Sequence, residues 1–237
     1  MRALLTLSLL VAARASAWPV DWMHDVEPGK ERFIRLPRLD WFEVEDPKVA
    51  QLEWLADSGE LLISGLKAGR TTVLLGAEGR VAAWRIRVGA RPLQDEAATK
   101  AAQKACPDLR LTPLDEVRLT VTAHDEACRA ALLTLFQTDV VEARALEVTF
   151  SQEVLQAQLK DLQKAYDTVA KGKVKARYVG AGLVLTGVVT TAEYRKVLWE
   201  TLRRSLGRFA LDDQLEVLAP PAAPADAGPP KTEPVRR

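Results

Sequence analysis

Turn signals divide the chain between Glu27 and Val88 into short segments, and this division leaves no room for a long helix. Apolar or alternating segments span residues 32–36, 41–45, 61–63, 72–75 and 81–88. The turn formers between them are Pro28-Gly29, Asp46-Pro47, Asp57-Ser58-Gly59, Ala68-Gly69 and Glu78-Gly79. Short strands bounded by such residues are typical of all-β domains. The pattern therefore predicts a small β-sandwich over residues 18–91.

Two motifs in this region are defined by spacing and not by reactive groups. The first is Asp46-Pro47-x-Val49-Ala50, and the second is Gly65-x-x-x-Gly69-x-Thr71-Thr72. The second motif lacks the Gly-Lys-Ser/Thr ending of a phosphate-binding loop. Both motifs resemble the N-terminal domain of pilus-assembly secretins of the type II, type III and Tad secretion group. The resemblance implies assembly, with a secretin, another pilus or secretion component, or a second copy of the chain as partner.

Two further regions, residues 94–150 and 151–218, predict the same order of helix, strand, strand, helix and strand. In the first, these elements are expected at residues 95–105, 108–111, 117–122, 125–136 and 145–150. In the second, they are expected at residues 151–170, 174–179, 183–189, 191–206 and 214–218. Ser151 is expected to cap the long helix, and Gly172 to end it. Residues 117–120 align with residues 183–186, which indicates a degenerate tandem repeat.

Gly187 lies inside a predicted strand, where glycine marks a bulge or a close approach of two backbones. The run from Gly180 to Val189, the helix after it and Leu215-Glu216-Val217 together resemble a BON domain. The implied fold class is multi-domain β and α+β: a small N-terminal β-sandwich followed by one or two BON-like αββαβ units. Tad-type secretins show the same order before a pore domain. The chain stops where that domain would begin, so we expect an accessory protein without the channel.

The two ends of the chain have compositions that do not predict packed domains. Residues 1–17 combine Arg2, an apolar run and the small residues Ala15-Ser16-Ala17, which is typical of a cleaved signal peptide. The apolar run is shorter than the ~20 residues that a membrane-spanning helix needs. Residues 219–237 are rich in proline and alanine and are expected to be disordered. These features predict export to the periplasm, with no transmembrane segment after cleavage.

The chain has two cysteines, Cys106 and Cys128. An even number of cysteines in an exported protein favours a disulfide, and each of the two lies on the apolar face of a predicted helix. Two buried free thiols are the alternative. No CxxC motif is present, so a catalytic thiol pair is not expected.

The remaining residues offer little support for chemistry. The 33 basic and 32 acidic residues give a net charge of +1, which provides no reason to expect nucleic acid as a partner. His24 and His124 are far apart, without zinc-ligand spacing. Neither Ser64 nor Ser151 has the glycine surroundings of a nucleophile elbow. We therefore expect no catalytic site, no metal and no cofactor.

The leading hypothesis is a non-enzymatic periplasmic accessory or scaffold protein of the Gram-negative envelope, acting in pilus assembly or secretin-linked secretion. An alternative is an envelope-binding module for phospholipid or peptidoglycan, with Trp41, Trp54 and Trp84 as a stacking surface. The interpretation that we prefer for these three tryptophans is sandwich core or ordinary surface. An exported hydrolase is a third hypothesis. The basic cluster Arg203, Arg204 and Arg208 is expected to be a solvated helix end that complements the helix dipole.

Overall fold

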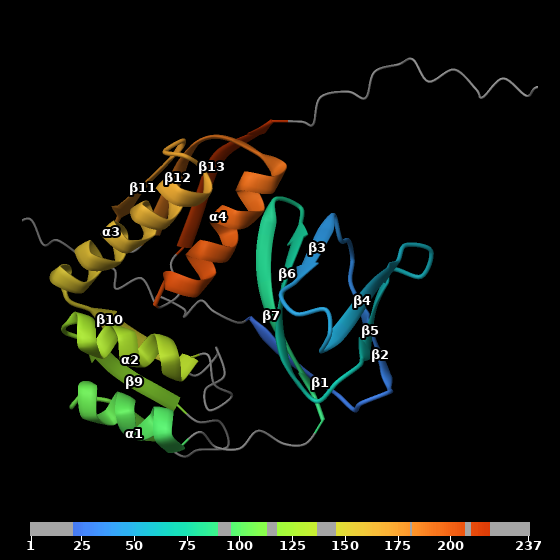
Figure 1. The fold of residues 1–237 in the computed structure, drawn as a ribbon, viewed down its shortest axis with the longest axis horizontal. Coiled ribbons are helices and arrows are strands. Elements are labelled where there is room, and N and C mark those ends of the chain that lie inside the picture. Colours follow the sequence, from blue (N-terminus) through green and yellow to red (C-terminus); the bar gives the residue numbers. More distant parts are fainter. Residues whose placement is uncertain are drawn as a thin grey trace, which may run out of the picture.

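The computed structural model describes residues 21–89, 96–112, 118–136, 146–180, 182–206 and 210–218. The predicted signal peptide at residues 1–17 and the proline-rich segment at residues 219–237 lie outside the described residues. The described part contains an N-terminal group of strands followed by two groups of mixed helices and strands (Figure 1). The predicted combination of a β-rich region and α+β elements is confirmed.

The N-terminal group, which we call the sandwich, consists of two sheets with a common core. One sheet has the order β1 (Trp22–Val26), β7 (Arg80–Val88), β6 (Gly69–Ala77) and β3 (Trp41–Val44). The other has the order β2 (Glu31–Arg35), β5 (Glu60–Gly65) and β4 (Ala50–Leu55). Residues of both sheets, such as Ile63 and Ile86, meet in one buried cluster. Strands β1 and β4 were missing from the sequence prediction, and β1 pairs in parallel with β7.

The second and third groups share one topology, and we call them the second and third units. The second unit contains α1 (Glu96–Ala105), β8 (Arg110–Thr112), β9 (Arg118–Ala123), α2 (Glu126–Phe136) and β10 (Leu146–Phe150). The third contains α3 (Gln152–Val169), β11 (Val174–Val179), β12 (Gly182–Thr190), α4 (Thr191–Arg204) and β13 (Ala210–Leu218). In each sheet the central strand pairs antiparallel with the strand before it and parallel with the strand after it.

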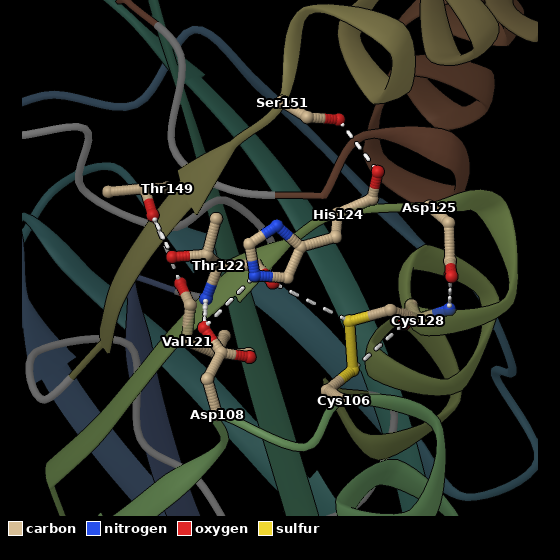
Figure 2. Close-up of a disulfide and its surroundings, with 9 residues drawn as sticks. All are labelled: Cys106, Asp108, Val121, Thr122, His124, Asp125, Cys128, Thr149 and Ser151. Carbon is tan, nitrogen blue, oxygen red and sulfur yellow. Dashed lines mark hydrogen bonds and ion pairs between the residues drawn. A yellow bond between two sulfur atoms is a disulfide. The ribbon is translucent and has the colours of Figure 1, made fainter.

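Ser151 joins the second and third units with no linker between them. Its backbone N–H donates to the carbonyl of Ala123 (3.0 Å), and its hydroxyl donates to the carbonyl of His124 (2.8 Å; Figure 2). The same hydroxyl accepts a hydrogen bond from the N–H of Val154, so Ser151 is the N-cap of α3 as predicted. The Val154 side chain is buried in the core of the second unit. The first turn of α3 therefore belongs to both units.

Gly187 brings β12 against the start of β11. Its backbone has a φ of +144°, and a β-carbon at this position would overlap the carbonyl oxygen of Lys173. Any other residue would force the two backbones apart. This close approach is the one that the sequence pattern indicates for a glycine inside a strand.

Candidate functional site

The Asp46-Pro47 motif forms a turn between β3 and β4 that is fixed to the start of β6. The backbone N–H of Asp46 donates to the hydroxyl of Thr71 (2.8 Å), and one carboxylate oxygen of Asp46 accepts from the N–H of Lys48 (3.0 Å). The Thr71 side chain is buried. This part-buried hydrogen bond gives the backbone N–H of Asp46 a partner within the fold. Asp46 and Thr71 therefore hold the fold at this turn.

Val49 and the two motif glycines meet at the neighbouring connection between β5 and β6. The carbonyl of Val49 accepts from the N–H groups of Leu66 (2.9 Å) and Lys67 (3.2 Å). Gly69 has a φ of +153°, and a β-carbon there would lie 3.3 Å from a methyl group of Val49. A β-carbon on Gly65 would lie 2.7 Å from the carbonyl oxygen of Glu27. The motif residues thus join the strands of the two sheets, and their geometry is architectural.

Helix α4 lies between two sheets and connects the third unit to the sandwich (Figure 1). Its residues Leu198, Trp199 and Leu202 form a buried cluster with Leu74 of β6 and Ala83 of β7. Since β6 and β7 also contribute to the sandwich core, these two strands are covered on both faces. Where a strand is buried on both faces, consecutive residues are apolar, which accounts for the run at residues 73–75 of β6.

Trp41 extends this contact at the edge of the sandwich. Its ring packs against the α4 cluster, and the guanidinium of Arg195 lies 5.3 Å from the ring centroid. The indole lies over Gly76, where a β-carbon would overlap the indole nitrogen. Trp41 can therefore occupy this position because residue 76 has no β-carbon. A cation over a tryptophan ring adds a modest electrostatic attraction to this contact.

Arginine side chains connect the ends of the helices to their neighbours. Arg85 of β7 is buried, and its guanidinium donates to the carbonyl of Phe136 at the end of α2 (3.2 Å). Arg129 of α2 is also buried and donates to the carbonyl of Arg204 at the end of α4 (3.0 Å). A positive group at a helix C-terminus is favourable because the last carbonyls carry partial negative charge.

The basic cluster at the end of α4 makes ion pairs with two other parts of the fold. Arg203 pairs with Glu45 of the sandwich (3.2 Å), and Arg204 pairs with Asp161 of α3 (2.9 Å). Both side chains remain solvated, as predicted for a helix end, with 48% of Arg203 and 40% of Arg204 exposed, and each also joins α4 to another element. Arg208 lies outside the described residues.

A cleft of about 360 Å³ opens where the sandwich meets the second and third units. Its described lining consists of Glu45, Arg70, Thr71, Thr72, Arg85, Leu133, Phe136, Trp199, Leu202, Arg203 and Ser205. Thr72 is the one second-motif residue besides Thr71 that reaches the cleft. The Ser205 hydroxyl is buried and has no hydrogen-bond partner among the described residues. This described lining contains no His or Cys.

The two cysteines form a disulfide between the end of α1 and the first turn of α2 (Figure 2). Cys106 and Cys128 are both buried in the core of the second unit, so the alternative of two free thiols is wrong. Nearby, Asp125 accepts a hydrogen bond from the backbone N–H of Cys128 (2.8 Å). Asp108 accepts one from the N–H of Thr122 (2.8 Å). These contacts position the bridge within a fixed framework.

His24 lies in β1 beside Trp84, with ring centroids 4.6 Å apart in an edge-to-face arrangement. Burial, reinforced by the positive charge of Arg32, lowers the pKa of His24 to about 4. The ring is therefore neutral at physiological pH. No group of His, Cys, Asp and Glu side chains that could hold a metal ion occurs among the described residues.

The three tryptophans that the alternative hypothesis would use as a stacking surface lie in or against the cores, as the preferred interpretation expects. Trp84 is buried in the sandwich core, Trp54 packs against that core, and Trp41 packs against the α4 cluster. Trp22 is 50% exposed. Within the described ranges, no helix combines the length and the apolar character needed to cross a membrane.

A comparison with protein families finds one family that is similar to the sandwich. Residues 23–89 match the family described as "Pilus formation protein N terminal region". The predicted resemblance to the N-terminal pilus domain is confirmed for residues 23–89. No curated protein matches the chain.

The similar solved structures are distant. Domains 4 and 5 of the S-layer protein SbsC share 10% identity over 32% of this chain and 44% of that one, with a TM-score of 0.25. CdsD, described as a structural protein of the type III secretion system of Chlamydia trachomatis, shares 15% identity over 55% of this chain and 66% of that one, with a TM-score of 0.27. The chain thus spans less than half of the SbsC fragment. TM-scores this low carry no argument about fold or function.

Proposed function

We propose that this chain is a non-enzymatic accessory protein of pilus assembly or secretin-linked secretion, acting as a scaffold in the periplasm. The single observation that carries the proposal is the family match of residues 23–89. The geometry is compatible with a structural role, because the motif residues Asp46, Val49 and Thr71 connect neighbouring strands and turns.

We also propose that residues 94–150 and 151–218 are two BON-like domains. Support comes from the shared order αββαβ and the shared pairing of the central strand with its two neighbours. Gly187 adds to this support, since it allows the close approach of β11 and β12. The contacts of α4 and Arg85 hold the sandwich and the two units together. In this proposal, the three parts bind a partner as one rigid body.

Export to the periplasm is the third part of the proposal. It rests on the composition of residues 1–17 and on the disulfide, which forms readily in an oxidising compartment. Cell fractionation followed by N-terminal sequencing of the product tests it. The expected product begins near Trp18 and is found in the periplasmic fraction. An uncleaved cytoplasmic product would contradict this location.

A binding experiment tests the proposed function. The purified chain is immobilised and exposed to the purified periplasmic part of the secretin from the same organism. We expect saturable binding that Phe33→Ser weakens at least ~10-fold, because Phe33 is a large exposed side chain on an edge strand of the sandwich. Val188→Ser, an exposed apolar residue of the third unit, is the matched control and should leave binding unchanged.

The same experiment separates the proposal from the envelope-binding alternative. Phospholipid vesicles and peptidoglycan replace the secretin in parallel samples. Saturable binding to vesicles or glycan, with none to the secretin or to other pilus components, would favour the alternative and overturn the proposed function. The burial of Trp84 and the packing of Trp41 already weaken the argument for a stacking surface.

A further inference from the structure

The sheet of the third unit has two edges of opposite charge. Its strand order places β11 at one edge and β13 at the other. Strand β11 carries the exposed residues Lys175 and Arg177, whereas β13 carries the exposed residues Asp212 and Glu216. Among the described strands, no further strand pairs with either edge. Edge strands present backbone donors and acceptors that another strand can use.

The four charged side chains point to the same face of this sheet. Arg177 lies opposite Val184, and Val184 lies opposite Asp212, so all three share one face. Lys175 and Glu216 are an even number of residues from these positions along their own strands and share that face as well. The helices cover the other face, where Leu183 and Leu185 are buried. The basic residues of β11 and the acidic residues of β13 would therefore lie side by side if two such sheets paired edge to edge.

We propose that β13 of one copy of this chain adds to β11 of the next copy and extends the sheet. The strand directions permit this contact, because β11 runs antiparallel to β12 while β13 runs parallel to it. Two copies in the same orientation would thus form an antiparallel pair of β13 and β11. In the register that places Lys175 opposite Glu216, Arg177 lies opposite Gln214 and diagonal to both Asp212 and Glu216. Opposite charges in direct and diagonal cross-strand pairs are stabilising.

Charge repulsion also opposes two-fold symmetric contacts, in which an edge strand pairs with the same edge strand of a second copy. Pairing β11 with β11 would oppose Lys175 and Arg177 with like charges, and pairing β13 with β13 would oppose carboxylates. Charged edges usually prevent association between sheets, but this protection fails when the two edges of one sheet carry opposite signs. A head-to-tail contact remains, and such contacts form rings or open chains. This inference does not depend on the proposed function.

On each edge strand, a side chain already forms hydrogen bonds with backbone groups, and an incoming strand would have to displace it. The side-chain amide of Gln163 donates to the carbonyl of Val174 (2.9 Å) and accepts from the N–H of Ala176 (3.1 Å), as a neighbouring strand would. On β13, the carboxylate of Asp213 accepts from the N–H of Leu215 (3.1 Å). Since incoming backbone groups replace these bonds one for one, the association is expected to be weak and dependent on concentration.

Sedimentation velocity with charge-reversal variants tests the proposal. One variant, Lys175→Glu/Arg177→Glu, has two acidic edges, and the other, Asp212→Lys/Glu216→Lys, has two basic edges. For the unchanged chain, we expect a sedimentation coefficient that rises with concentration and falls with added salt. Each variant alone should sediment as a monomer. An equal mixture of the two should associate again, because every contact then joins opposite charges.

The matched control reverses two exposed lysines away from the sheet edges, Lys104→Glu/Lys196→Glu, and should associate like the unchanged chain. Circular dichroism confirms that each variant is folded. A sedimentation coefficient of the unchanged chain that does not vary with concentration would overturn the proposal. So would a mixture that remains monomeric, or single variants that still associate.

Discussion

The guanidinium of Arg85, on strand β7 of the sandwich, donates to the last carbonyl of α2, at Phe136 (3.2 Å). This bond connects a strand of the N-terminal domain with a helix that begins 41 residues further along the chain (126 − 85). It satisfies a carbonyl that the helix cannot satisfy itself, and it places positive charge at the negative end of the helix. The two parts of the chain therefore share an interaction that neither could make alone.

Replacing Arg85 should destabilise the folded protein. Arg85→Ala removes a buried charged donor and leaves the Phe136 carbonyl without it, so we expect a loss of about 2–4 kcal/mol in the free energy of unfolding. Urea unfolding followed by circular dichroism measures this loss. Arg80→Ala, on the exposed end of the same strand, is the control and should change the stability by less than about 0.5 kcal/mol. Equal losses in the two variants would refute the role of Arg85.

Gly76→Ala should displace Trp41 from the α4 contact. The added β-carbon would overlap the indole, so the ring must move away from Leu74 and Trp199. We expect a loss of about 2–4 kcal/mol, since an aromatic contact and its buried area are lost together. Tryptophan fluorescence during urea unfolding reports both effects. Gly79→Asn serves as control, because a β-carbon at Gly79 meets nothing within 4 Å and Asn tolerates its φ of +71°.

Reduction of the disulfide should lower the stability of the second unit. The bridge joins cysteines 22 residues apart, and closing such a loop stabilises a protein by about 3 kcal/mol in the chain-entropy model. Thermal unfolding with and without a reductant measures the change. The double variant Cys106→Ala/Cys128→Ala should show no effect of reductant. An unchanged melting temperature of the native chain after complete reduction would contradict the prediction.

His24 should make the stability depend on pH in the acidic range. Its pKa is lowered by burial from 6.5 to about 4 in the folded chain, so the unfolded chain binds a proton more readily between these values. The contribution of His24 is therefore complete above about pH 6.5 and is lost as the pH falls toward 4. We expect about 1–2 kcal/mol, because solvent reaches part of the ring. The difference between native and His24→Phe unfolding curves isolates this term, and His124→Ala should retain it.

Gln163→Ala should open the β11 edge. The variant loses two hydrogen bonds with Val174 and Ala176, which should cost about 1–2 kcal/mol of stability. Because the edge is then free for another strand, the sedimentation coefficient at high concentration should rise above that of the native chain. Gln156→Ala, an exposed residue on the same helix, is the matched control. Weaker association of Gln163→Ala would contradict a covering role for this amide.

Local patterns predicted the features that depend on few neighbouring residues. The N-cap at Ser151 and the close approach at Gly187 follow from the chemistry of one residue in its own element. The pairing of Cys106 with Cys128 required only two apolar helix faces on one core. The family motifs at Asp46 and Gly65 likewise led to the correct family for residues 23–89.

Contacts between distant elements were not predictable in the same way. Strand β1 pairs with β7 in the register Trp22 to Trp84, and nothing in five residues specifies a partner so far away. The packing of α4 against two sheets is, however, indicated by its own sequence. Val197, Leu198 and Trp199 are consecutive and cover about 200° of the helix circumference, which is too wide for one sheet. Such a stripe indicates a second covering surface, but it does not say which one.

The connection at Ser151 also determines how the chain carries load. Strand β10 ends at Phe150 and α3 begins at Gln152, so one residue, bonded to Ala123 and His124, separates the two units. A pull on the third unit therefore reaches the central strand of the second unit without first stretching an elastic segment. In mechanical terms, the two units behave as one lever, so that a force applied to either unit is transmitted directly to the other.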